Sequence, residues 1–198
     1  TAAQHSQFFP SLYMNTPGIM VAAPSTPADA KGILKTAIRG SNPVLFIESA
    51  ALYGARGLIP EEETLAPFGK ADIKRAGSDV TIVAVSRMVG EALTAADTLS
   101  SDGISAEVID PRTLVPLDTD SILASVKKTA RLITAEDSCV TCGVGAEIVA
   151  RVTERAMDSL ENVVRIACPD IPAPFSPPLQ KAYMPGKEMI ERAVREMV

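Results

Sequence analysis

The sequence predicts an α/β protein of three layers (α/β/α), in which mostly parallel sheets lie between helices. The first observation is an apolar run at residues 19–23, a helical pattern at 26–39 and a second apolar run at 44–47. Strands that are apolar along their whole length are typical of parallel sheets, and the helix supplies the crossover between them. The second observation is that strand and helix patterns alternate again from residue 80 onward. The 198 residues are therefore expected to form two units.

The helix at residues 26–39 has clear start and stop signals. Thr26 is placed as the N-cap, Pro27 occupies the first helical position, and Asp29 lies in the first turn. The Gly-Ser-Asn-Pro segment at 40–43 ends the helix. One face is apolar, because its residues recur at intervals of three and four: Ala30, Ile33, Leu34, Ala37 and Ile38.

Residues 54–79 show no long hydrophobic period and predict a connection between the two units. Pro60, Pro67 and Gly69 interrupt any regular pattern. The acidic run Glu61-Glu62-Glu63 is typical of a solvated surface.

The second unit shows the same alternation of elements. Asp118 is placed to cap one of its helices, and residues 169–178, with five prolines, predict an ordered or extended loop. The chain then ends in an amphipathic helix. The strands are expected at 80–85, 106–110, 132–135 and 163–167, and the helices at about 89–103, 118–128, 143–159 and 188–197.

Composition excludes several classes of function. The net charge is −5 with acids and bases mixed, so no basic block indicates a nucleic-acid partner. No apolar run approaches the roughly 20 residues that a membrane-spanning helix needs. The three cysteines, Cys139, Cys142 and Cys168, do not suggest a disulfide framework and fit a reducing compartment.

Several motifs of the second unit have both a chemical and a structural interpretation. Cys139 and Cys142 have redox-motif spacing, but two small residues in a loop are the favoured interpretation, and zinc would need more ligands. Gly143 and Gly145 open a helix, where a phosphate could approach, but close backbone packing is the favoured interpretation. Glu136-Asp137 at a strand end suggests catalytic acids or, more simply, capping or interface polarity.

His5 is the only imidazole in the chain. Histidine is the side chain best suited to proton transfer near neutral pH, whereas a lone histidine with polar neighbours is more often a surface residue. The residues alone therefore establish a two-unit α/β protein without secure chemistry.

A resemblance to one family extends over almost the full length of the chain. Residues 3–7 (Ala-Gln-His-Ser-Gln) are similar to its histidine segment, and residues 110–118 are similar to its D-x-R-T-x-x-P-x-D passage. The family is the beta subunits of thiamine-diphosphate-dependent 2-oxo acid dehydrogenases, with pyruvate dehydrogenase preferred. The matching stretches are residues 3–7, 24–39, 42–54, 107–118, 143–148 and 173–176.

The resemblance implies a division of the chain and a role for His5. Residues 1–66 would be the remainder of a pyrimidine-binding domain, and residues 67–198 a transketolase C-terminal-like domain. The chain is expected to be truncated before its histidine segment, so that the glutamate that activates the cofactor and the main pyrimidine contacts lie in the missing part. His5 would be the catalytic residue and would transfer protons or stabilise charge.

The implied cofactor is thiamine diphosphate, shared with an alpha subunit that also holds magnesium. Further expected partners are a second beta subunit and a lipoyl acyltransferase core. Some members hold a potassium ion, and the positions that match its ligands are Ala37, Ile38, Gly40 and Asn42. Carbonyl oxygens at a helix end suit such a cation, because they lack partners within the helix. The departure from the pattern is Gly40, where an aspartate is common, and an ordinary helix stop explains these residues as well.

The function expected from the resemblance is oxidative decarboxylation of pyruvate with acyl transfer to lipoyl groups, catalysed only in an assembly of alpha and beta subunits. Acetoin dehydrogenase and branched-chain 2-oxo acid dehydrogenase beta subunits are the alternatives, and a transketolase-like enzyme is a weaker one. A different class of function is an inactive fragment that serves in assembly or docking. The compartment would be the bacterial cytoplasm, the mitochondrial matrix or a plastid.

Overall fold

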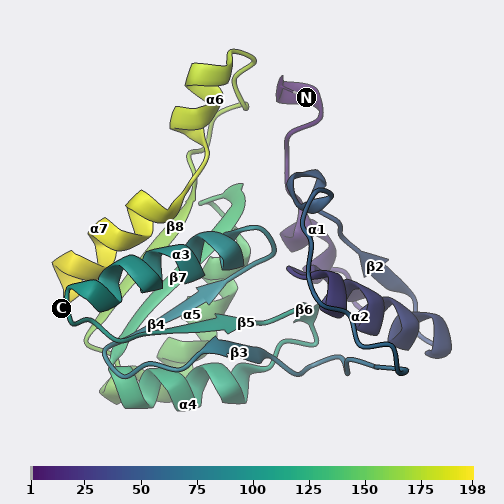
Figure 1. The fold of residues 1–198 in the computed structure, drawn as a ribbon, viewed down its shortest axis with the longest axis horizontal. Coiled ribbons are helices and arrows are strands. Elements are labelled where there is room, and N and C mark those ends of the chain that lie inside the picture. Colours follow the sequence, from purple (N-terminus) through teal and green to yellow (C-terminus); the bar gives the residue numbers. More distant parts are fainter. Residues whose placement is uncertain (1) are drawn as a thin grey trace.

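The structure is a computed structural model that describes residues 2–198 and contains two β-sheets (Figure 1). The three-stranded sheet has the order β2-β1-β6, and the five-stranded sheet has the order β3-β5-β4-β7-β8. We call residues 2–66 the amino-terminal unit and residues 67–198 the carboxyl-terminal unit. The expected α/β class with mostly parallel strands is confirmed.

The smaller sheet contains the strand–helix–strand unit that the sequence predicts. Strands β1 (Met20–Ala22) and β2 (Val44–Phe46) are parallel, and α2 (Pro27–Arg39) connects them. Thr26 caps α2, because its side-chain oxygen accepts a hydrogen bond of 3.1 Å from the backbone N–H of Asp29. The third strand, β6 (Thr113–Val115), comes from the carboxyl-terminal unit and pairs antiparallel with β1. The elements that precede β1 are η1 (Ala2–Gln4) and α1 (Pro10–Met14).

The larger sheet has a parallel centre and one antiparallel edge. Its parallel strands are β4 (Val80–Ala84), β5 (Ala106–Asp110), β7 (Arg131–Cys139) and β8 (Asn162–Cys168). The edge strand β3 (Asp72–Arg75) pairs antiparallel with β5.

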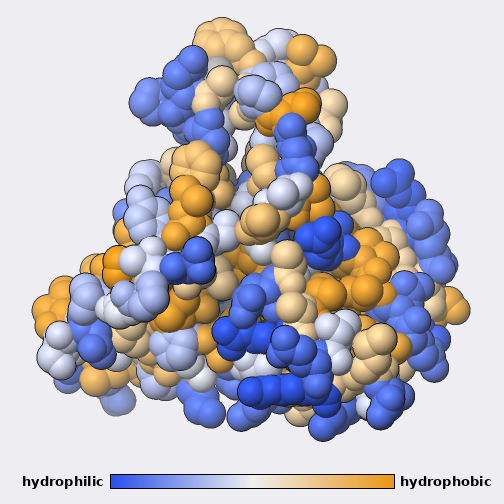
Figure 2. Space-filling model, turned by 180° about the vertical axis from the view of Figure 1, so that it is seen from behind, coloured by the Kyte–Doolittle hydropathy of each residue, from blue (hydrophilic) through white to orange (hydrophobic). Residues whose placement is uncertain are grey.

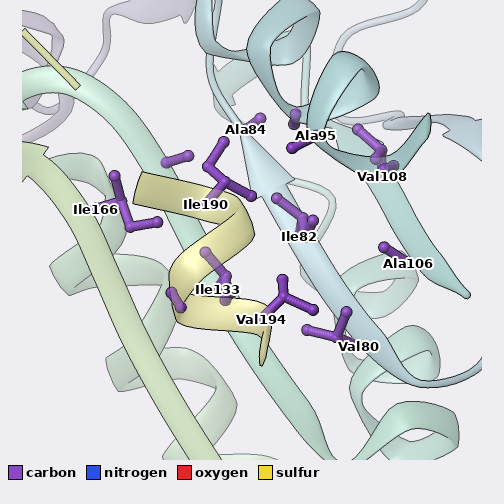
Figure 3. Packing of buried hydrophobic residues seen from close by; sticks show 14 of the residues in the cluster. Val80, Ile82, Ala84, Ala95, Ala106, Val108, Ile133, Ile166, Ile190 and Val194 are labelled. Carbon is purple, nitrogen blue, oxygen red and sulfur yellow. The ribbon is translucent and has the colours of Figure 1, made fainter. Parts of the chain in front are cut away.

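Helices cover both faces of the larger sheet and complete three layers. Ile82 of β4 belongs to the hydrophobic cluster formed with α3 (Met88–Ser101) and α7 (Lys187–Met197). The next residue, Val83, points to the opposite face and joins the cluster of α4 (Thr119–Thr129) and α5 (Val144–Ala156). Figure 3 shows α7 laid over the sheet, with its apolar side chains directed at the strands.

Three parts of the carboxyl-terminal unit differ from the sequence prediction. The expected connection at 54–79 contains β3, whose Ile73 is exposed while Lys74 is largely buried, so the strand carries no hydrophobic signal. Strand β7 continues past Ala135 to Cys139. The proline-rich segment leads into a short helix, α6 (Pro177–Tyr183), because proline is well tolerated in a first helical turn.

The remaining elements are short 3-10 turns, η2 (Ala50–Leu52) and η3 (Met157–Ser159). Figure 2 shows hydrophilic and hydrophobic side chains interspersed over one face of the molecule. Within residues 2–198, none of the helices combines the length and the apolar character that crossing a membrane requires.

Candidate functional site

His5 lies directly after η1, and its side chain is exposed. The segment around it projects from the body of the molecule on the same side as α6 (Figure 1). His5 is not among the lining residues of the pocket at the ends of β1 and β2 or of two larger hollows in the described part of the chain. The catalytic role expected for His5 is untested by this geometry and stays a prediction.

A pocket of about 210 Å³ opens at the carboxyl ends of β1 and β2. These strands are parallel, and the start of α2 forms one wall, which is where ligands commonly bind in open α/β sheets. Its polar atoms include Glu48, which accepts a hydrogen bond of 3.2 Å from the Tyr53 hydroxyl. This hydrogen bond raises the pKa of Tyr53 above its ordinary value. The lining residues are Pro24, Ser25, Thr26, Pro27, Ala30, Glu48, Ser49, Leu52, Tyr53 and Ala55.

A polar cluster joins the two units beside this pocket. We call it the junction cluster and define it as Ser25, Asp29, Lys74, Asp110 and Arg112. Lys74 Nζ lies 2.7 Å from Asp29 Oδ2, and Arg112 Nη1 lies 3.2 Å from Asp29 Oδ1. The Ser25 hydroxyl donates a hydrogen bond of 2.5 Å to Asp110 Oδ2. Residues far apart in the chain thus fix the start of α2 against the larger sheet.

Burial and neighbouring charges shift the carboxyl pKa values of the junction cluster in opposite directions. Burial raises the pKa of Asp110 to about 6, although hydrogen bonds from Ser25 and the positive charge of Lys74 oppose the shift. Burial also tends to raise the pKa of Asp29, but hydrogen bonds from Lys74, Thr26 and Arg112 outweigh it and lower that pKa.

The sequence predicts that Thr26 and Asp29 lie at the start of a helix. It does not predict the ion pairs of Asp29 with Lys74 and Arg112. The resemblance singles out the Asp110–Arg112 passage but not its contacts. Arg112 has a φ of 58°, an unusual value for a residue other than glycine, and its N–H donates a 2.8 Å hydrogen bond to Asp110 Oδ1. Lys74 was missed because it lies on β3, the strand without a hydrophobic pattern.

The structural interpretation of Glu136, Gly143 and Gly145 is confirmed. Glu136 is 3% exposed, and its carboxylate accepts hydrogen bonds from Val144 N at 2.8 Å and Gly145 N at 2.6 Å. It therefore caps α5 and occupies two of the N–H groups that a phosphate would need. A Cβ atom on Gly143 would lie 2.6 Å from Glu136 Oε1, so the glycine permits a close approach.

Asp137 and the acidic run also have structural contacts. Asp137 Oδ1 forms an ion pair of 2.6 Å with Arg87 Nη2 of the same chain, and a role for Asp137 at an interface stays a prediction. Within the run, Glu61 and Glu62 are exposed, and Glu63 Oε1 lies 2.6 Å from Arg39 Nη2, an ion pair on the surface of α2.

Cys139 and Cys142 are exposed, whereas Cys168 is buried. Cys139 is the last residue of β7, so the redox-motif pair lies across a strand end rather than inside one loop. In residues 2–198, no three His, Cys, Asp or Glu side chains are grouped so that they could hold a metal ion.

The positions proposed for potassium lie together at the carboxyl end of α2. The backbone N–H of Gly40 donates to the carbonyl oxygens of Thr36 at 3.0 Å and Ala37 at 3.2 Å, which closes the last turn. Gly40 and Asn42 are exposed, and Ile38 is 75% exposed. Both the ordinary helix stop and the cation site are compatible with this geometry.

The pocket at the ends of β1 and β2 is too small to enclose thiamine diphosphate by itself. The pocket at the ends of β1 and β2 holds about 210 Å³, below the roughly 300–1,000 Å³ of ordinary ligand pockets. A larger hollow of about 580 Å³, between α1, β6 and the start of α5, has no histidine in its lining.

Comparison with known proteins identifies the family. Residues 69–190 match the family described as transketolase, C-terminal domain, and residues 1–56 match the transketolase pyrimidine binding domain. The chain is 47% identical to the mitochondrial pyruvate dehydrogenase E1 component subunit beta-1 of Arabidopsis thaliana, over 96% of this chain and 54% of that protein. It is 44% identical to the acetoin:2,6-dichlorophenolindophenol oxidoreductase subunit beta of Cupriavidus necator, over 98% of this chain and 58% of that protein.

A solved structure described as a split gene transketolase, inactive beta4 tetramer, superposes with a TM-score of 0.80. It is 28% identical, and the match covers 95% of this chain and 60% of that one. The chain thus spans little more than half the length of the proteins it resembles. On the strength of the match over residues 69–190, the chain belongs to the transketolase family.

Proposed function

We propose that this chain is part of the beta subunit of the decarboxylating component of a pyruvate dehydrogenase complex. The observation that carries the proposal is the 47% identity to a pyruvate dehydrogenase E1 beta subunit over 96% of this chain. The fold agrees with it, because a pyrimidine-domain strand–helix–strand unit precedes a transketolase C-terminal domain. We set the boundary between the two domains at residues 66 and 67, and the packing of Ala66 against Ile33 supports it.

In this function thiamine diphosphate would supply the electron sink for decarboxylation of a 2-oxo acid. His5 would transfer a proton or stabilise charge beside the cofactor and during acyl transfer to a lipoyl group. Its exposure supports a role at a surface that a neighbouring chain completes. The relatives are longer than this chain, and we place the main pyrimidine contacts in the parts of them that it does not cover.

The proposed partners are an alpha subunit that holds the diphosphate and magnesium, a second beta subunit and a lipoyl acyltransferase core. Exposed apolar side chains of the amino-terminal unit, such as Leu12 at 65% and Tyr53 at 71%, support burial against other chains. A potassium ion at Ala37, Ile38, Gly40 and Asn42 would stabilise the end of α2 in that assembly. The proposed compartment is the cytoplasm in a bacterium, or the mitochondrial matrix or a plastid in a eukaryote.

A second candidate is an acetoin dehydrogenase beta subunit, which the 44% identity to the Cupriavidus necator protein favours. Branched-chain 2-oxo acids are a further alternative. A third candidate, from another class, is an inactive assembly module, because the chain spans only part of its relatives.

The test is to purify the chain alone and together with a cognate alpha subunit, supply thiamine diphosphate and magnesium, and measure reduction of an artificial electron acceptor. We expect activity only in the assembly, and a higher kcat/KM for pyruvate than for acetoin. Preference for acetoin would select the second candidate, and turnover by the isolated chain would contradict the dependence on partners.

The role of His5 is tested by His5→Gln in the assembled enzyme, with Gln7→Ala as the matched control on the same exposed segment. We expect His5→Gln to lower kcat by about 100-fold or more, the usual contribution of a general acid–base group, with an unchanged melting temperature. Lost stability with full activity per folded molecule would instead show that His5 is structural.

A further inference from the structure

Two cysteines that are far apart in the sequence are neighbours in the larger sheet. Cys139 ends β7 and Cys168 ends β8, and the two are register partners in this parallel pair, beyond an irregularity in the register after Ala135. Directly paired residues of adjacent strands point to the same face of a sheet. Their Cα atoms are expected about 4.8 Å apart, inside the roughly 4.4–6.8 Å range of disulfides. The cysteine closest to Cys139 in sequence, Cys142, lies in the following turn with a φ of 56°.

The two thiols differ sharply in environment. Cys139 is exposed, whereas Cys168 is fully buried and its Sγ donates a hydrogen bond of 3.2 Å to the carbonyl oxygen of Asp137. Burial raises the pKa of Cys168 to about 12. Tyr183, the last residue of α6, has its hydroxyl close to both thiols, and burial and these neighbours raise the pKa of that hydroxyl. An exposed thiol beside a protected one is the arrangement of dithiols that exchange with disulfides.

We infer that Cys139 and Cys168 are a modification site that takes small-molecule disulfides and forms a reversible intrachain disulfide. The Cys139 thiolate attacks one sulfur of the small disulfide, whose S–S bond breaks and releases one thiolate. The Cys168 thiol passes its proton to that departing thiolate. Its sulfur then attacks the Cys139 sulfur and releases the second small thiol. Two protein thiols are thereby oxidised, and one small disulfide is reduced to two thiols.

The disulfide would act on α6. Cys168 must leave the Asp137 carbonyl, and the new bond takes the space between the two thiols and the Tyr183 hydroxyl. Helix α6 has only seven residues and no buried side chain, so contacts at its end matter for its position. This helix projects beyond the sheet in Figure 1. Oxidation is therefore expected to loosen α6 and leave the centre of the sheet unchanged.

The experiment exposes the native protein to oxidised glutathione and then blocks free thiols with an alkylating reagent under denaturing conditions. We expect the wild-type protein to lose the Cys139 and Cys168 thiols without added mass at either, while Cys142 stays free or carries one glutathione that mass spectrometry counts, and dithiothreitol to restore all three thiols. Trypsin places Cys139 and Cys142 on one peptide, 132–151, and Cys168 on another, 166–181. A linked mass therefore identifies Cys168 but does not distinguish Cys139 from Cys142.

The variant Cys142→Ser decides between these two. It retains only Cys139 and Cys168, and we expect it to lose both alkylatable thiols as a monomer. Cys139→Ser should form no intrachain link and leave Cys168 free, and circular dichroism before oxidation checks its fold. An internal link within peptide 132–151, or a Cys142→Ser protein that keeps the Cys168 thiol, would overturn the inference.

Discussion

The two units of this chain differ in how completely they bury their apolar side chains. The carboxyl-terminal unit has a five-stranded sheet covered on both faces, and side chains such as Ile82 and Ile133 are fully buried. The amino-terminal unit contributes two strands and α2. The buried members of its own hydrophobic cluster are Ala22, Ile33 and Ala66. Ile38 of α2 is 75% exposed. One unit therefore carries its own stability, whereas the other depends on contacts beyond itself.

The largest expected effect is the difference between equivalent substitutions in the two units. Ile82→Ala should lower the free energy of unfolding by about 2–5 kcal/mol, because it leaves a cavity in a closely packed core. Ile38→Ala should change it by less than about 0.5 kcal/mol, because that side chain is exposed. Urea denaturation of the isolated chain measures both. Equal losses would show that the amino-terminal unit is as well packed as the other.

The next effect concerns the contact between the units. Lys74→Met should lower the free energy of unfolding by about 1–3 kcal/mol, because Asp29 and Asp110 lose their shared cation in a buried setting. Hydrogen exchange should increase in α2 and stay unchanged in α3. The control is Arg75→Met on the same strand, whose partner Asp97 is exposed, so the cost should stay below about 1 kcal/mol. An equal increase of hydrogen exchange in α2 and α3 would mean that the junction cluster stabilises the whole protein and not the amino-terminal unit in particular.

The pH dependence of the junction follows from Asp110. Its pKa of about 6 in the folded state is above the ordinary 3.8, so folding favours the protonated form. The stability that Asp110 contributes is fully present below about pH 3.8 and is lost as pH rises through about 6. Denaturation from pH 4 to 7 should show the wild type losing stability relative to Asp110→Asn in that window. Parallel curves for the two proteins would contradict a buried Asp110 carboxyl.

The smallest expected effect uses one helical glycine from each unit. Gly90 in α3 has open space where a Cβ would lie, so Gly90→Ala should stabilise the protein by about 0.5–1 kcal/mol. A Cβ on Gly32 in α2 would lie 3.1 Å from Ala66 Cβ, so Gly32→Ala should be neutral or destabilising. Thermal melts of both variants test whether α2 is held closely against residues 64–66. A stabilising Gly32→Ala would show that it is not.

The sequence predicts regular elements well wherever apolar periodicity decides them. The cap at Thr26, the cap at Asp118 and the strands of the parallel centre agree with the structure. The edge strand β3 was missed because its inward side chain is Lys74, which is buried through ion pairs rather than through apolar contact. Hydrophobic patterns report burial in a core and give no signal for burial in a polar network.

The candidate site is harder to predict, because its contacts join distant parts of the chain. Ser25 and Asp110 are 85 residues apart, and the Cys139–Cys168 pair depends on the register of β7 and β8. The Cys139–Cys142 spacing is visible in the sequence, whereas the Cys139–Cys168 register pair is not. Capping is one of the roles that the sequence predicts for Glu136, because an acid at a strand end lies close in sequence to the helix that follows, and the structure confirms it.

Strand β6 belongs to the carboxyl-terminal unit but pairs with β1, so it links the two units even when the exposed connection between them is cleaved. Residues 57–63 are exposed, so a protease would find a substrate there. The fragment that begins after the cut still supplies Thr113–Val115 to β1, and the backbone N–H of Ala23 still donates a hydrogen bond of 2.9 Å to the carbonyl oxygen of Arg112. A nicked molecule would therefore migrate as one particle in a sizing column and separate into two pieces only in denaturant.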